Sequence, residues 1–140
     1  MYAFFGHNKI NKLEDDLFLN SPLLRTIDFS WNRLNRVSVP FARRNDNMTH
    51  IYFHHNNIRS LPSNLIYGSR KLRSADFEFN KLQAVRYVKP EKRVKPKNMH
   101  TIDLQRNWRM GRNLNTVRRK KYAWDTEYLD SILRMSFMAC

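Results

Sequence analysis

The stretch LRTIDFSWNRL, residues 24–34, decides the fold, because its apolar residues and its asparagine return at fixed spacing along the chain. This repeat frame has apolar residues at its first, fourth, sixth and eleventh positions and asparagine at its ninth. The recurring asparagines are Asn8, Asn32, Asn56, Asn80 and Asn107, so the period is 24 residues three times and 27 residues once. A period of this size is typical of solenoid repeats. The sequence therefore predicts a repeat protein of about five copies.

Each feature of the frame has a physical reason. Alternating apolar residues such as Ile27 and Phe29 predict a short strand with one face buried. The side-chain amide of an inward asparagine can pair with backbone groups of the turn that follows the strand. Because one repeat cannot bury its apolar face alone, neighbouring repeats must stack, which gives a parallel sheet along one side of the stack.

This pattern resembles the leucine-rich repeat family over about residues 3–107. The resemblance implies an α/β solenoid, a rod with a short parallel sheet on its concave side and an irregular convex side. The 24-residue form is similar to the type common in extracellular members, which implies a receptor or adhesion-type protein. The repeats are expected over residues 1–23, 24–47, 48–71, 72–98 and 99–107.

The segment 108–140 differs from the repeats. It begins with basic residues and continues with apolar residues at helical spacing, while Asp125, Glu127 and Asp130 lie where a helix N-terminus favours carboxylates. We expect a C-terminal helix that caps the last repeat. A helix that binds a partner is the alternative.

The start of the chain, its single cysteine and one glycosylation sequon indicate what kind of protein the repeats could belong to. Met1 falls inside the first repeat frame, so we expect the chain to be part of a longer repeat protein. No basic and apolar leader and no run long enough to span a bilayer occur in the sequence. The single cysteine, Cys140, excludes an intrachain disulfide. Asn47-Met48-Thr49 forms a glycosylation sequon, for which an ordinary loop asparagine is the alternative interpretation.

The outward positions of the strands are the candidate binding positions, because the inward ones form the core. Parallel strands lie about 4.8 Å apart, so equivalent side chains should touch in columns. The column directly before the asparagines holds His7, Trp31, His55, Phe79 and Arg106. Exposed aromatic residues are typical of protein interfaces, although scattered ones are ordinary on any surface. We predict that a protein partner contacts Asp28, Trp31, Tyr52, His54, His55, Asp76, Glu78, Phe79, Asp103 and Arg106.

The charge distribution supports a second hypothesis. The net charge is +14, and residues 86–121 hold 13 of the 26 lysines and arginines with only Glu91 and Asp103 against them. Such a region can bind a polyanion, either nucleic acid or glycosaminoglycan, or it can simply be a solvated loop and tail. The residues expected to bind a polyanion are Lys92, Arg93, Lys95, Lys97, Arg118, Arg119, Lys120 and Lys121.

Catalysis and metal binding find no support in the sequence. The cysteine is terminal and the chain has only three glycines, with no phosphate-binding loop and no serine-histidine-acid set suggested by the repeat geometry. The histidines and carboxylates do not form a set of three or four close metal ligands on the predicted strands. We therefore expect a non-enzymatic protein without a cofactor, a metal ion or a small-molecule substrate.

Overall fold

The computed structural model describes residues 1–15, 17–18, 20–37, 45–62, 70–86, 101–104 and 106–107. This part of the chain contains seven strands of three residues each and no helix, so it holds no helix that could cross a membrane. The predicted capping helix and basic segment of 108–140 lie outside the described residues, as do all eight residues of the polyanion hypothesis.

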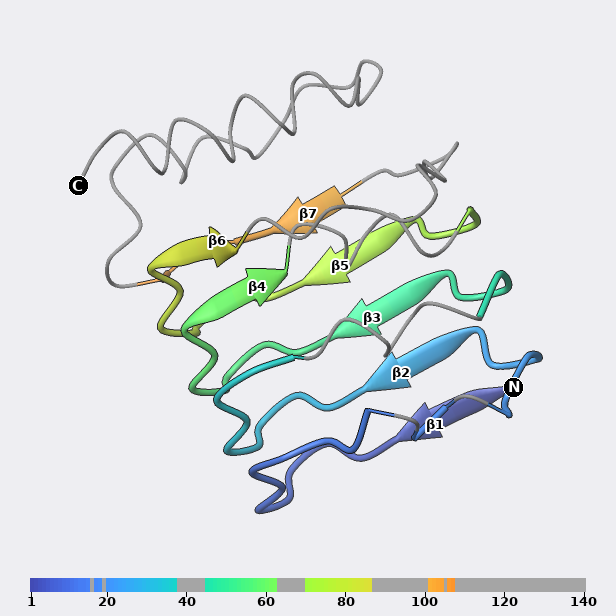
Figure 1. The fold of residues 1–140 in the computed structure, drawn as a ribbon, viewed down its shortest axis with the longest axis horizontal. Coiled ribbons are helices and arrows are strands. Elements are labelled where there is room, and N and C mark those ends of the chain that lie inside the picture. The colour runs from blue at the N-terminus through green and yellow to red at the C-terminus, as the bar shows by residue number, and fades with distance from the viewer. Residues whose placement is uncertain are drawn as a thin grey trace.

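Five of the strands form one parallel sheet with the order β1-β2-β3-β5-β7 (Figure 1). They are β1 (Tyr2–Phe4), β2 (Thr26–Asp28), β3 (His50–Tyr52), β5 (Ser74–Asp76) and β7 (Thr101–Asp103). Each strand pairs with the copy of itself in the next repeat, so Ala3, Ile27, Ile51, Ala75 and Ile102 lie in register. A parallel sheet of successive strands is compatible with a solenoid, as the repeat frame predicted.

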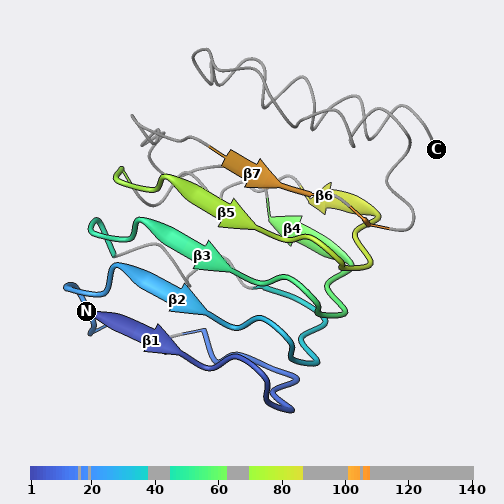
Figure 2. The same cartoon turned by 180° about the vertical axis from the view of Figure 1, so that it is seen from behind.

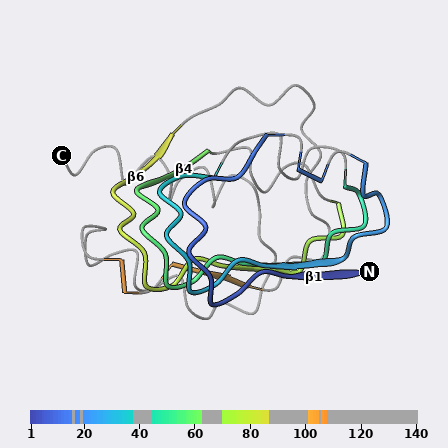
Figure 3. The same ribbon diagram turned by 90° about the horizontal axis from the view of Figure 1, so that it is seen from below.

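A second, smaller sheet lies on the other side of the coiled chain from the main sheet (Figure 2, Figure 3). In it β4 (Ser60–Pro62) pairs in parallel with β6 (Ala84–Arg86). The sequence predicted an irregular convex side, and this prediction was wrong for these residues. Backbone hydrogen bonds between repeats continue past the asparagines, for example from Lys81 N to Ile58 O at 2.9 Å. Any extended stretch that recurs at the repeat spacing meets its own copy in register and can pair with it.

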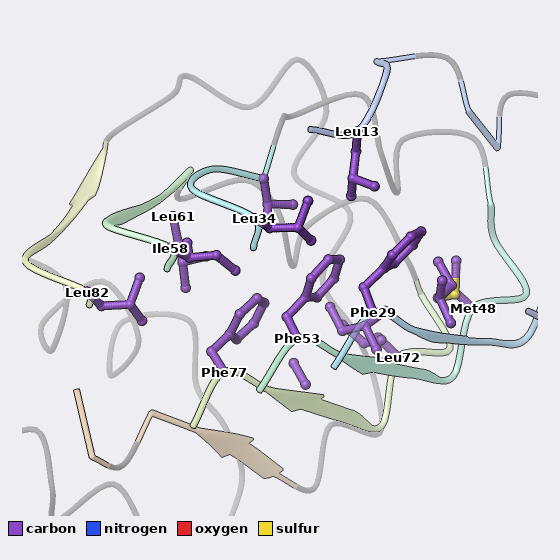
Figure 4. Close-up of a cluster of buried hydrophobic side chains, with 14 of the residues drawn as sticks. Leu13, Phe29, Leu34, Met48, Phe53, Ile58, Leu61, Leu72, Phe77 and Leu82 are labelled. Carbon is purple, nitrogen blue, oxygen red and sulfur yellow. The ribbon is translucent and has the colours of Figure 1, made fainter. Parts of the chain in front are cut away.

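The core is a column of apolar side chains between the two sheets (Figure 4). Phe29, Phe53 and Phe77 are buried at the sixth frame position, and their rings stack with centroid separations of 5.7 and 5.6 Å. Leu34, Ile58 and Leu82 are fully buried at the eleventh position. The inward positions predicted from the frame are therefore confirmed for these residues.

Buried asparagines join each repeat to the one before it. Asn56 Nδ2 donates to Phe53 O of its own turn at 3.1 Å and to Phe29 O of the preceding repeat at 2.9 Å. Its Oδ1 accepts the N–H of Leu34, also in the preceding repeat, at 2.9 Å. The same three kinds of bond recur in an asparagine ladder formed by Asn32, Asn56, Asn80 and Asn107. The pairing with the turn was predicted, whereas the bridge to the preceding repeat was not.

Candidate binding face

The outward face of the main sheet carries a continuous stack of side chains, which we call the ring column. It consists of His7, Trp31, His55, Phe79 and Arg106. Adjacent rings are stacked and nearly parallel, with centroid separations of 5.4 Å for His7 and Trp31, 3.8 Å for Trp31 and His55, and 4.1 Å for His55 and Phe79. The guanidinium carbon of Arg106 lies 4.6 Å from the centre of the Phe79 ring. The contacts that the repeat spacing predicted within this column are therefore present.

All members of the ring column have a left-handed backbone conformation, with φ between 52° and 57°. This conformation costs a residue other than glycine roughly 1–2 kcal/mol. The turn that requires it directs two carbonyls toward the following asparagine: Asn32 Nδ2 donates to Phe29 O and to Ser30 O, both at 3.2 Å. The asparagine ladder thus imposes the turn, and large side chains occupy it despite the backbone cost.

This backbone conformation makes a prediction about Phe79, whose φ is 52°. Both Phe79→Gly and Phe79→Ala remove the stacked ring, but only alanine keeps the steric cost of positive φ. We expect the glycine variant to have the higher free energy of unfolding, by about 1 kcal/mol, in urea denaturation followed by circular dichroism.

The matched control is Gln83, which is exposed and does not have a positive φ. There the order should reverse, with Gln83→Gly less stable than Gln83→Ala by about 0.5–1 kcal/mol. If Phe79→Ala were as stable as Phe79→Gly, the positive φ at this position would carry no steric cost, and the prediction would be wrong.

A second set of side chains, the aspartate column, runs beside the ring column at the ends of the strands. Asp28, Tyr52, Asp76 and Asp103 lie in register on successive strands. The backbone N–H of Ser30 donates to Asp28 Oδ1 at 2.8 Å, and that of Glu78 donates to Asp76 Oδ1 at 2.9 Å. Each of these bonds holds one oxygen of the carboxylate to the backbone of the turn. Within the described ranges, neither Asp28 nor Asp76 forms an ion pair.

Burial and neighbouring charges shift two groups of this face. Burial raises the pKa of Asp76, an effect that its backbone hydrogen bond partly opposes. Burial, followed by the effect of adjacent His54, lowers the pKa of His55. The rings of these two histidines meet nearly edge to face, with centroids 5.4 Å apart. This shift favours the uncharged form of His55.

One cation of the chain already contacts this face. Arg106 Nε lies 3.7 Å from Glu78 Oε1 while its guanidinium covers the Phe79 ring. The two contacts are compatible because a planar guanidinium can stack on a ring and pair with a carboxylate at its edge. Arg106 thus closes one end of the ring column.

The structure brings together all ten residues that the sequence assigned to partner binding. They extend over β2, β3, β5 and β7 and the turns that follow these strands, on the outward face of one sheet. The left-handed conformation of the ring column was missed, because the usual signal for it, glycine, is absent from these positions. In the described part of the chain, no group of three or more histidine, cysteine, aspartate or glutamate side chains could hold a metal ion.

No protein-family model matches this chain, and no curated protein matches it either.

Proposed function

We propose that the chain is a leucine-rich repeat protein. Three observations support this: the repeat frame, the parallel pairing of strands 24 residues apart, and the asparagine ladder between neighbouring repeats. Family membership of this kind specifies a mode of recognition and not a partner, since one fold serves many functions.

Its function, in this proposal, is non-enzymatic recognition of a protein partner across the outward face of the main sheet. The observation that carries the proposal is the ring column beside the aspartate column on one open sheet face. Trp31, the second of the five members of the ring column, remains 47% exposed although it is one of the largest side chains. Aromatic anchors with polar surroundings are the groups that contribute most to protein interfaces.

The charge of residues 86–121 favours polyanion binding as a second candidate function. Its lysines and arginines would neutralise phosphates or sulfates and release counterions, so affinity would fall steeply with salt. A steep loss of affinity with salt therefore distinguishes polyanion binding from recognition of a protein through the ring column.

A pull-down with the intact 1–140 chain tests the proposal, after nuclease treatment and at low and high salt, with captured proteins identified by mass spectrometry. The variant Trp31→Gly with Phe79→Gly removes two rings at positions where glycine fits the backbone. We expect proteins retained at high salt to be reduced at least about tenfold by this change.

The control variant is Leu17→Ala with Leu23→Ala, which removes two side chains that are 45% and 69% exposed and belong to neither column. It should capture the same proteins as the unchanged chain, and circular dichroism should show that both variants fold. Capture unaffected by the ring changes would contradict the proposal. Capture that disappears with nuclease or salt would instead favour the polyanion function.

A further inference from the structure

The ring column limits how a ligand can contact this face. Trp31 is stacked between His7 and His55, and Phe79 between His55 and Arg106. Both faces of these rings are therefore covered by the chain itself, and only the ring edges remain for a ligand. A nucleobase or a sugar binds aromatic residues through ring faces, as in stacking on single-stranded nucleic acid. The outward face does not offer this contact at Trp31, His55 or Phe79.

The aspartate column, in contrast, has unused capacity for cations. Asp28 and Asp76 are half-buried carboxylates, each with one oxygen held by the backbone and no ion pair to a described residue. Removing a carboxylate from water is unfavourable unless a cation or hydrogen-bond donors compensate.

Arg106 shows how a cation fits this face. Its guanidinium contacts Glu78 and the Phe79 ring at once, with the distances of 3.7 and 4.6 Å given above. Asp28 and Asp76 also lie beside members of the ring column, but no arginine of the described chain reaches them. A partner's arginine or lysine would supply the missing charge.

We propose that the partner docks an extended basic segment across the strands, placing arginine or lysine side chains on Asp28 and Asp76. Asp28 and Asp76 are two strands apart, with Tyr52 between them. Two strand spacings amount to about 9.6 Å. Three residues of polyproline II chain span about 9.3 Å, and its turn of three residues places every third side chain on the same face. A basic residue at every third position therefore matches both carboxylates. This inference rests on the proposed function, because it names the partner of the same face.

The test uses the intact, nuclease-treated 1–140 chain and fluorescent peptides in anisotropy titrations at physiological ionic strength. One peptide contains three Arg-Ser-Ser units, and the matched peptide contains three Glu-Ser-Ser units. We expect the arginine peptide to bind more tightly although the chain is strongly basic. Asp28→Asn with Asp76→Asn keeps both Oδ1 acceptors for the backbone and should weaken binding of the arginine peptide at least about tenfold.

The control Asp15→Asn with Asp46→Asn makes the same change of net charge at exposed residues outside both columns, and should change affinity by less than about twofold. Equal losses in the two double variants, tighter binding of the glutamate peptide, or no binding of the arginine peptide would each overturn the inference. The proposed function would survive any of these results if protein capture still depended on Trp31 and Phe79. It would fall if capture did not depend on them.

Discussion

Replacing Asn56 with alanine should lower the free energy of unfolding by about 3–5 kcal/mol, because three buried backbone groups lose a partner at once. The N–H of Leu34 loses its acceptor, Asn56 Oδ1, in a position closed to water. The carbonyls of Phe29 and Phe53 each keep one donor, from Asn32 and Asn80 respectively, and lose the other. Since whole domains are stable by only about 5–15 kcal/mol, this variant should be close to unfolding. Urea denaturation followed by circular dichroism measures the loss.

Asn8 provides the control at the same frame position. It is exposed, and among the described residues its Nδ2 donates to Phe5 O and Gly6 O, which are in an exposed turn. Asn8→Ala should cost less than about 1 kcal/mol. Equal losses of unfolding free energy in Asn8→Ala and Asn56→Ala would contradict this prediction. They would mean that neither burial nor the bonds to the preceding repeat account for the stabilising effect of the asparagine ladder.

The repeat frame predicted most of the main sheet and its core. Residues such as Ile51 and Phe53 are apolar, alternate along the chain and recur in every copy, so their burial followed from the pattern alone. The stacking of the ring column also followed, because equivalent residues of parallel strands are neighbours. In both cases the local pattern and the strand spacing were sufficient.

Other features depend on geometry that residue type does not encode. The pairing of β4 with β6 was missed because both strands lie beyond the eleven residues of the repeat frame, and because Pro62 has no backbone N–H to donate to a ladder. The left-handed turns were missed because large residues such as Trp31 rarely adopt positive φ and give no local signal for it. The asparagine bonds to the preceding repeat depend on how far one coil rises above the next, which no single repeat contains.

Replacing Phe53 with alanine should destabilise the chain by about 3–5 kcal/mol, the usual cost of removing a buried phenylalanine. Phe53 is fully buried between Phe29 and Phe77, so neither neighbouring ring can move into the space without leaving its own stack. The cost should show as a lower denaturation midpoint in urea. Phe4→Ala, which removes a side chain that is 69% exposed, should change stability by less than about 0.5 kcal/mol.

A double variant tests whether the phenylalanine column behaves as one packed unit. If Phe53→Ala and Phe77→Ala create adjoining cavities, their combined cost should differ from the sum of the single costs by at least about 0.5 kcal/mol. Phe29 lies against Phe53 and Phe53 against Phe77, with no direct stacking between Phe29 and Phe77. The pair Phe29→Ala with Phe77→Ala should therefore be closer to additive. Strict additivity for both pairs would mean that each ring is supported by its own repeat and that stacking between repeats contributes little, in conflict with a core built by neighbouring coils.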